Sequence, residues 1–215
     1  MTKAQIIEGL LTPGVVAIIR ADNSEQLIHA SRALIEGGVS GIEITMTTPN
    51  ALKVIADVRR AFGDKVLAGV GSVLDAKTAE AAIAAGAEYV VTPVLRPDVI
   101  TFCNHIGKPI FSGSYTPTEA QTAYELGADF IKIFPADGLG PKYIQAIRGP
   151  LPHLNIVPTG GVDVNTAGDF IKAGCVAVAA GSSLVSKEIL KNQEWAKLSD
   201  LASQFIKAVA KARGK

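Results

Sequence analysis

The chain has 215 residues, of which 48% are hydrophobic and only 6% aromatic. This length suits one domain with a sizeable core that Ala, Val, Ile and Leu must fill. The 21 basic and 20 acidic residues leave a net charge of +1. No basic cluster is present, which argues against nucleic acid as the ligand and favours a small molecule.

The first residues lack an apolar signal core, and no stretch of the chain resembles a membrane-spanning helix. We therefore expect a cytoplasmic protein with no membrane partner. Cys103 and Cys175 form no close-spaced pair, and no local pattern supplies a histidine partner. We interpret them as reduced, buried thiols.

One pattern recurs along the chain: a short apolar run, a turn, an Ala-rich helical segment and a glycine. Eight apolar runs predict strands, at Val15–Ile19, Gly41–Thr45, Val66–Gly69, Tyr89–Thr92, Pro109–Ser112, Phe130–Phe134, Asn155–Pro158 and Val176–Ala180. Helical periodicity lies between them, as at Ser24–Ile35, Ala51–Phe62, Thr78–Ala85 and Thr118–Leu126, and two more helices are expected at Met1–Leu11 and Glu194–Lys211.

Helix boundaries carry their own signals. Predicted N-caps are Asp22, Asp75 and Asp163, and Thr116-Pro-Thr-Glu has the form of a capping box with proline in the first turn. The glycines that close the helical segments are predicted to take left-handed C-cap conformations, namely Gly37, Gly86, Gly107, Gly127 and Gly174.

Eight successive βα units predict parallel strands joined by right-handed helical crossovers. The fold class is therefore α/β, and we expect a single (βα)₈ TIM barrel spanning residues 1–215 with an extra N-terminal helix. The alternative is an open, doubly wound sheet. It would need a nucleotide fingerprint after the first strand, and Arg20-Ala-Asp is not one.

Active sites of such barrels form at the C-terminal ends of the strands, so inward polar residues at those ends are the candidates. Lys132 lies between Ile131 and Ile133, and strand alternation predicts that it faces the interior. Burial disfavours an ammonium, and a neutral amine can attack a ketone to form an imine. The alternatives are a lysine whose head reaches solvent and one that pairs with a carboxylate.

Glu43 occupies the same kind of position in the second predicted strand, between Ile42 and Ile44. An enclosed carboxyl group suits general acid–base catalysis, although a structural ion pair with Lys132 is the competing interpretation. Arg20 ends the first strand, where its side chain could bind a carboxylate or a phosphate, or simply lie on the surface.

Glycine-rich loops follow the last two strands. They contain Thr159, Gly160 and Gly161 in the first loop, and Gly181 and Ser182 in the second, with Ser183 as a candidate cap for a short helix. Barrels commonly bind phosphate at these two loops, although ordinary tight turns would look similar.

The stretch Gly69-Val-Gly-Ser-Val lacks the third glycine of a dinucleotide loop. It favours close backbone approach to a small ligand, with the Ser72 hydroxyl as a donor. The histidines, His29, His105 and His153, have no metal-ligand spacing. We therefore expect no metal and no cofactor.

Eight stretches together resemble the bacterial 2-keto-3-deoxy-6-phosphogluconate (KDPG) / 4-hydroxy-2-oxoglutarate (KHG) aldolase family. They are Val16-Ala-Ile-Ile-Arg, Ile42-Glu-Ile-Thr, Ala68-Gly-Val-Gly-Ser-Val, Val91-Thr-Pro, Phe130-Ile-Lys-Ile-Phe-Pro-Ala, Gly140-Pro-Lys-Tyr-Ile, Pro158-Thr-Gly-Gly-Val and Gly181-Ser-Ser-Leu. They follow the family's order from about residue 5 to the end. The combination is specific, although no single stretch is.

The resemblance implies a homotrimer in which Lys132 forms a Schiff base with a keto acid and Glu43 shuttles protons. It further implies that Ser72 holds the pyruvyl carboxylate and that Pro93 and Phe134 line the pocket. Thr159, Gly160, Gly161 and Ser182 fall on the phosphate loops. Two positions depart from many members: Thr47 replaces an arginine that reaches the substrate carboxylate, and Val94 replaces a glycine.

The sequence thus predicts a metal-independent aldolase that cleaves a 2-keto-3-deoxy sugar acid to pyruvate and an aldehyde. The two candidate phosphate loops predict that this substrate is phosphorylated. Thr47 leaves 4-hydroxy-2-oxoglutarate open as the substrate. A phosphosugar isomerase or epimerase on the same barrel, and a non-catalytic sensor of a phosphorylated ligand, are the alternatives from other classes.

Overall fold

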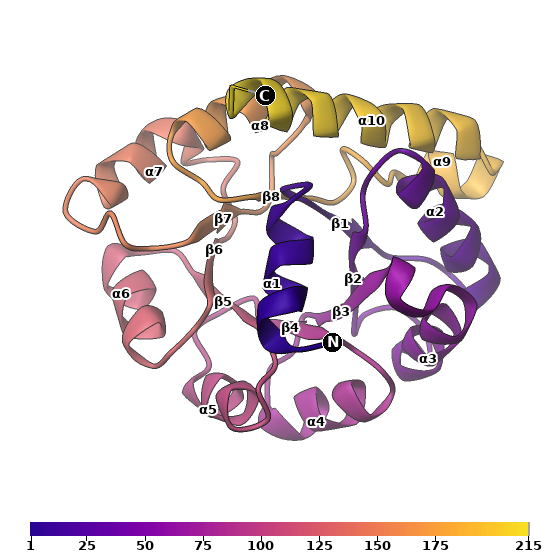
Figure 1. Ribbon diagram of the computed structural model, residues 1–215, viewed down its shortest axis with the longest axis horizontal. Coiled ribbons are helices and arrows are strands. Elements are labelled where there is room, and N and C mark those ends of the chain that lie inside the picture. The colour runs from indigo at the N-terminus through magenta and orange to yellow at the C-terminus, as the bar shows by residue number, and fades with distance from the viewer. Residues whose placement is uncertain (215) are drawn as a thin grey trace.

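The computed structural model describes residues 1–214. Eight parallel strands form one sheet in the order β7-β6-β5-β4-β3-β2-β1-β8. The strands are β1 (Val15–Ile19), β2 (Gly41–Thr45), β3 (Leu67–Gly71), β4 (Tyr89–Val91), β5 (Ile110–Ser114), β6 (Phe130–Ile133), β7 (Ile156–Pro158) and β8 (Val178–Ala180). A bridge from Thr159 to Ala179 closes the ring between β7 and β8. The predicted (βα)₈ barrel is confirmed (Figure 1).

Helices surround the strands (Figure 1). They are α2 (Ser24–Glu36), α3 (Ala51–Phe62), α4 (Ala76–Ala84), α5 (Pro97–His105), α6 (Pro117–Glu125), α7 (Gly140–Arg148), α8 (Val164–Lys172), α9 (Lys187–Asn192) and α10 (Trp195–Ala212), and a short 3₁₀ turn spans Gly63–Lys65. None of the described helices is both long enough and apolar enough to cross a bilayer.

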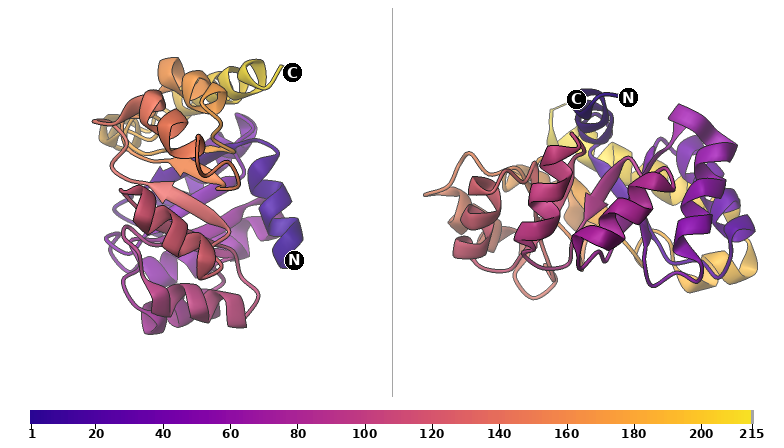
Figure 2. Two further views of the ribbon diagram at one scale, coloured as in Figure 1. Left: turned by 90° about the vertical axis from the view of Figure 1, so that its left-hand side faces the viewer. Right: turned by 90° about the horizontal axis from the view of Figure 1, so that it is seen from below.

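The extra N-terminal helix, α1 (Lys3–Leu11), lies across one end of the barrel (Figures 1 and 2). Its buried residues Ile6 and Leu10 pack with Val16 and Leu67, which are inward residues near the starts of β1 and β3. Lys3 Nζ lies 2.9 Å from a carboxylate oxygen of Asp129, just before β6, and helps to hold the helix in place. The barrel is therefore closed at the N-terminal ends of its strands, and its mouth is at the opposite end.

Strand alternation divides the core into two layers. The larger apolar cluster includes Ile131 and Ile133 and lies between the strands and the helices. The smaller one fills the barrel interior and contains, besides the α1 residues, Val16, Ile18, Leu67, Tyr89, Val91, Phe111, Phe130, Val157, Ala177 and Ala179. These are alternate residues of their strands, as a barrel interior requires. Lys132 and Glu43 continue this inward set.

The predicted caps are mostly confirmed. Asp75 and Asp163 cap α4 and α8, and Thr116 forms the capping box of α6. The prediction of Asp22 is wrong, because Asn23 caps α2 with a side-chain oxygen that accepts from the backbone N–H of Gln26.

The glycine prediction is wrong at one position of five. Gly37 keeps a right-handed conformation with a φ of −82°, and the left-handed residue is Gly38, at a φ of +93°. Two adjacent glycines left either assignment possible from sequence. The other four, Gly86, Gly107, Gly127 and Gly174, all have the predicted positive φ.

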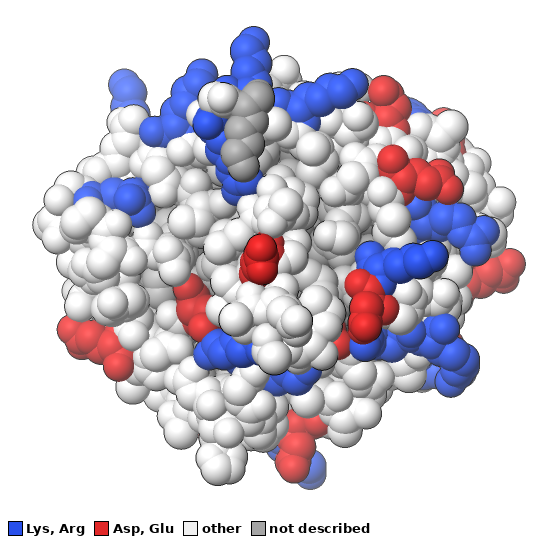
Figure 3. Space-filling view, in the orientation of Figure 1, with Lys and Arg blue, Asp and Glu red and all other residues white. Residues whose placement is uncertain are grey.

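On the face that α1 covers, acidic and basic side chains are interspersed, with basic ones more frequent along the edge near the C-terminus (Figure 3). The centre of this face is largely uncharged. A net charge of +1 is consistent with this mixed distribution.

Candidate active site

Lys132 lies inside the barrel near the C-terminal end of β6, and 6% of the residue is exposed. Its neighbours Ile131 and Ile133 belong to the outer core, so alternation points Lys132 inward. In the strand ladder it is paired with Gly113 on one side and Val157 on the other. The amine is thus held in a largely apolar setting that opens only toward the mouth.

Glu43 on β2 is 3% exposed, and its Oε1 lies 3.8 Å from the Lys132 Nζ. This separation permits electrostatic attraction but is too long for a hydrogen bond. The two groups come from strands on different sides of the ring and meet in its interior. At this distance the Lys132 nitrogen is not hydrogen-bonded to Glu43, so it can form a bond to a reacting carbon. The carboxyl group is still close enough to exchange a proton through a water or a substrate hydroxyl.

Two glycines of β3 make this placement possible. A Cβ added at Gly71 would lie 2.0 Å from Glu43 Oε1 and 2.6 Å from its carboxyl carbon, so any side chain there would displace the whole carboxyl group. A Cβ at Gly69 would lie 2.2 Å from the ring of Tyr89. The sequence suggested that this stretch approaches a ligand with its backbone. The structure shows that its two glycines first make room for side chains of the chain itself.

Gly113 on β5 has a similar role beside the lysine. A Cβ there would lie 2.2 Å from the backbone carbonyl carbon of Pro93, which follows β4. The absent side chain lets the end of β4 approach β5 beside Lys132, and the Gly113 N–H donates to the Thr92 hydroxyl. Our sequence analysis missed Gly71 and Gly113 as site residues. A glycine inside a strand is the only signal that could have indicated them.

Apolar side chains lie beside the amine at the mouth. The Lys132 Nζ lies 5.2 Å from the centre of the Phe134 ring, which is 37% exposed. Pro93 is half-buried at the end of β4. These two residues provide an apolar wall next to the amine, and the ring face also favours a positive charge on the nitrogen.

Ser72 directly follows β3 and has a φ of +60°. This left-handed conformation is uncommon for a residue with a side chain, and such residues are concentrated at functional sites. It lies next to Gly71, and hence next to the Glu43 carboxyl group. The hydroxyl of Thr45, the last residue of β2, lies 2.8 Å from the hydroxyl of Thr47 in the turn that follows, so Thr47 is hydrogen-bonded and uncharged at the mouth.

The loops after β7 and β8 lie side by side. Gly160 and Gly161 have φ values of +91° and +68°. Thr159 is buried, and its hydroxyl has no hydrogen-bond partner among residues 1–214. The Gly181 carbonyl accepts from the backbone N–H groups of Leu184 and Val185, which shapes the second loop and places the exposed Ser182 at its surface.

Ser183 does not cap a helix, contrary to expectation. Its hydroxyl donates to the Val162 carbonyl and thereby joins the two loops. Ser186 instead caps α9, by accepting from the Ile189 N–H. The turn after β8 thus continues three residues further than the sequence suggested before the helix begins.

Arg20 is exposed at the end of β1, beside the β8 loop. A Cβ built on Gly181 would lie 4.0 Å from the Arg20 Nη1. No ion pair to Arg20 is found within the part of the chain that the structure describes. The guanidinium is therefore available at the same edge of the mouth as Gly181 and Ser182.

The two cysteines are buried, and burial raises the pKa of each thiol to about 12. Thiols with such a pKa are almost fully protonated near neutral pH, so neither is a nucleophile there. Within residues 1–214, no group of three or more His, Cys, Asp or Glu side chains is placed to hold a metal ion.

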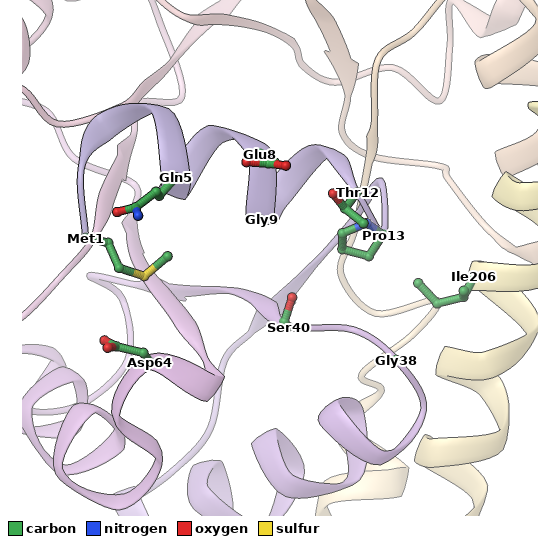
Figure 4. Close-up of a pocket in the computed structure, with 10 residues that line it drawn as sticks. All are labelled: Met1, Gln5, Glu8, Gly9, Thr12, Pro13, Gly38, Ser40, Asp64 and Ile206. Atoms are coloured by element: carbon green, nitrogen blue, oxygen red, sulfur yellow. The ribbon is translucent and has the colours of Figure 1, made fainter.

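A groove of about 830 Å³ lies elsewhere, between α1 and the N-terminal ends of β2 and β3 (Figure 4). It is lined by Met1, Gln5, Glu8, Gly9, Thr12, Pro13, Gly38, Ser40, Asp64 and Ile206. Because barrel enzymes carry out their chemistry at the C-terminal ends of the strands, this groove is not the candidate site.

The geometry defines a class: a (βα)₈ barrel with an enclosed lysine–carboxyl pair below two glycine-rich loops. The sequence profile of the KDPG and KHG aldolase family matches residues 6–201, so the chain belongs to this family. A 2-dehydro-3-deoxy-phosphogluconate aldolase from Haemophilus influenzae is 32% identical over 206 residues, which cover 95% of this chain and 97% of the relative.

Two solved structures are similar as well. A structure described as native KDPGal has a TM-score of 0.87 and 31% identity, covering 94% of this chain and 96% of that one. KDPG aldolase from Legionella pneumophila, with pyruvate captured as a covalent carbinolamine, has a TM-score of 0.84 and 26% identity, covering 91% and 96%. Family membership makes this chain an aldolase and a lyase. It favours that activity over the isomerase, epimerase and sensor alternatives.

The packing of Gly71 against Glu43 generates a prediction. Gly71→Ala should lower the aldolase activity by roughly a hundredfold, because a displacement of about 1 Å in an active site has an effect of that order. Gly138→Ala is the matched control, since a Cβ there meets nothing within 4 Å. Steady-state kinetics and circular dichroism of both variants make the comparison. Full activity in a folded Gly71→Ala variant would contradict the packing argument.

Proposed function

We propose that this protein is a Schiff-base aldolase, with Lys132 as the nucleophile and Glu43 as the proton-transfer group. Its substrate is KDPG or a related 2-keto-3-deoxy sugar acid, and its products are pyruvate and an aldehyde such as glyceraldehyde 3-phosphate. The observation that carries the proposal is the enclosed Lys132 Nζ, 3.8 Å from Glu43 Oε1. The covalent carbinolamine of pyruvate in the Legionella pneumophila relative supports it.

In the proposed reaction, the neutral Lys132 amine attacks C2 of the substrate, and loss of water gives a protonated imine. Glu43 takes the proton of the C4 hydroxyl, the C3–C4 bond breaks, and its electron pair moves toward the imine nitrogen. The aldehyde leaves and an enamine remains. Glu43 returns the proton to C3, and water hydrolyses the imine to pyruvate and free lysine. Proton transfer of this kind contributes roughly 10²–10⁴-fold to a rate.

Each step needs the Lys132 amine and the Glu43 carboxyl group to reach the same substrate molecule. The barrel interior supports this requirement, because it encloses both groups. The neutral form of the amine is the one that attacks the ketone, and Phe134 beside the Lys132 nitrogen limits its contact with bulk water. Breaking of the C3–C4 bond delivers electrons to a cationic nitrogen, and the low local polarity strengthens the attraction between that cation and Glu43. The same carboxyl group then acts as base and as acid without moving between strands.

The substrate-binding assignments follow the positions of the side chains. Ser72, which is half-buried and has a positive φ directly after β3, is assigned to the carboxylate at C1. Pro93 and Phe134 contact the pyruvyl carbons. The unpartnered hydroxyl of Thr159 is assigned to a substrate hydroxyl, because a buried hydroxyl without a partner is costly unless a ligand satisfies it.

The phosphate is assigned to the loops after β7 and β8. Gly160, Gly161 and Gly181 expose backbone there, and Ser182 offers a hydroxyl. Arg20 lies next to Gly181, which supports a role in binding phosphate rather than the C1 carboxylate. Thr47 offers only a hydroxyl where many relatives have a charged group, so the carboxylate of this chain's substrate is held by fewer charges.

Three further expectations are retained as proposals. The homotrimer is supported by the resemblance to the family, and a cytoplasmic location is proposed alongside it. One sheet that includes all eight strands supports a single domain over residues 1–215. No nucleic-acid or membrane partner is proposed.

The Schiff base can be tested directly by trapping. Borohydride added with pyruvate should reduce the imine and attach a pyruvyl group to Lys132, because only an imine on that nitrogen is converted to a stable amine. Peptide mass spectrometry should locate the adduct on the peptide that contains Lys132. It should vanish in Lys132→Met and persist in Lys53→Met, which changes an exposed lysine of α3. An unmodified Lys132 in the wild type would overturn the mechanism.

The role of Arg20 can be tested with a matched pair of substrates. Arg20→Gln should raise KM for KDPG by about 10- to 100-fold, the range expected for losing a charge-assisted hydrogen bond. It should leave KM for unphosphorylated 2-keto-3-deoxygluconate within about twofold, because that substrate lacks the phosphate. Arg60→Gln on the surface of α3 is the control. Equal losses on both substrates would show that Arg20 instead binds the shared carboxylate.

A further inference from the structure

Tyr89 is the first residue of β4 and points into the barrel below the site. It is fully buried, and its hydroxyl has no hydrogen-bond partner among the described residues. A buried hydroxyl without a partner costs free energy, which phenylalanine at the same place would avoid. The two other aromatic residues of the interior, Phe111 and Phe130, carry no polar atom. The hydroxyl of Tyr89 therefore requires a physical reason.

The strand ladder places Tyr89 in one row with the proton-transfer carboxyl group. Glu43 is paired with Gly69, and Gly69 is paired with Tyr89. A Cβ at Gly69 would lie 2.2 Å from Cε2, 2.3 Å from Cζ and 2.5 Å from Cδ2 of the Tyr89 ring, along one of its edges. The ring thus lies across β3, over the position where a side chain is missing, and extends from β4 toward β2, which carries Glu43.

The row of aromatic rings fixes this orientation. The rings of Tyr89 and Phe111 are 5.5 Å apart between centres, and those of Phe111 and Phe130 are 4.3 Å apart. Phe130 precedes Lys132 by two residues on β6, so the three rings form the floor below the amine and the carboxyl group. The Tyr89 ring is packed between Phe111 on one side and the space above Gly69 on the other, with its hydroxyl directed toward the Glu43 side.

The charged groups near this hydroxyl are few. The titratable side chains that face the interior are Glu43 from β2 and Lys132 from β6. The other neighbouring strands contribute apolar side chains: Ile18 from β1, Leu67 from β3, Phe111 from β5 and Val157 from β7. From below, α1 contributes Ile6 and Leu10. Burial raises the pKa of Tyr89 well above its ordinary value, and the negative charge of Glu43 adds to the shift. The phenol is therefore a donor at every working pH.

We propose that Tyr89 is a positioning residue for Glu43, to which it donates through one water molecule held inside the barrel. This inference rests on the proposed function, in which Glu43 moves protons. No direct hydrogen bond joins the two side chains, and a polar site with a phenol on one side and a carboxylate on the other is a suitable place for a buried water. The donated hydrogen bond favours the charged carboxylate, keeps it available as a base and directs it toward C3 and C4 of the substrate.

The test uses pyruvate alone, whose methyl hydrogens exchange with solvent when the enamine forms and is reprotonated. Exchange in D₂O is followed by NMR as a function of pH for the wild type and Tyr89→Phe. Without the donor, the carboxylate loses a hydrogen bond that holds it in place, so exchange near neutral pH should slow by about tenfold and the acid limb of the profile should move to higher pH. Borohydride trapping on Lys132 should remain at the wild-type level.

Ser112→Ala is the matched control. Its hydroxyl is also fully buried and has no partner within the described chain, but Ser112 is paired with Ile131, which belongs to the outer core rather than the interior. This variant should keep the wild-type pH profile. If Tyr89→Phe also keeps that profile while trapping succeeds, the positioning role is wrong and the proposed function stands. If trapping fails in the wild type, the proposed function itself is wrong.

A structural measurement keeps the inference testable even if Tyr89→Phe folds poorly. A high-resolution crystal structure of the wild type should show a water within about 2.8 Å of both the Tyr89 hydroxyl and a Glu43 oxygen, the usual length of such hydrogen bonds. A barrel interior without a water between these atoms, and without a direct bond between them, would overturn the proposal.

Discussion

The constraint on which the rest of the structure depends is the placement of an amine and a carboxyl group together inside a closed ring of strands. Lys132 and Glu43 are 6% and 3% exposed, and 3.8 Å separates their nearest charged atoms. Burying two such groups is costly unless they interact, and replacing a buried pair with apolar residues is often neutral or stabilising. Stability alone does not account for the pair. In the proposed mechanism both groups act on one carbon skeleton, which would explain why the barrel retains them.

Small residues make this placement possible. Gly71 leaves the space that Glu43 occupies, Gly69 leaves the space that the Tyr89 ring crosses, and Gly113 lets the end of β4 approach β5 beside Lys132. The N-terminal helix α1 closes the other end of the barrel with Ile6 and Leu10, so the interior opens only at the mouth. The glycine-rich loops after β7 and β8, joined by Ser183, form one edge of that mouth.

Much of the fold could be predicted because its signals are local. Alternation between the apolar strands and the Ala-rich helices specified eight βα units, and the bounds of β1 and β2 agree with the prediction at both ends. The inward direction of Lys132 followed from its two isoleucine neighbours. What failed depended on single backbone angles or hydrogen bonds: Asn23 caps α2 instead of Asp22, Gly38 is left-handed instead of Gly37, and Ser186 caps α9 instead of Ser183. The space that each of Gly69, Gly71 and Gly113 leaves is filled by a residue of a neighbouring strand or its end. The sequence around each glycine does not specify which residue that is.

The most direct test of the central claim is a crystal structure of the protein reduced with borohydride in the presence of pyruvate. The account predicts continuous electron density from the Lys132 Nζ to C2 of the pyruvyl group, with a Glu43 oxygen within hydrogen-bonding reach of C3 or of a water beside it, and the carboxylate near Ser72. Density that joins pyruvate to another residue, or a Glu43 side chain turned away from the adduct, would contradict it.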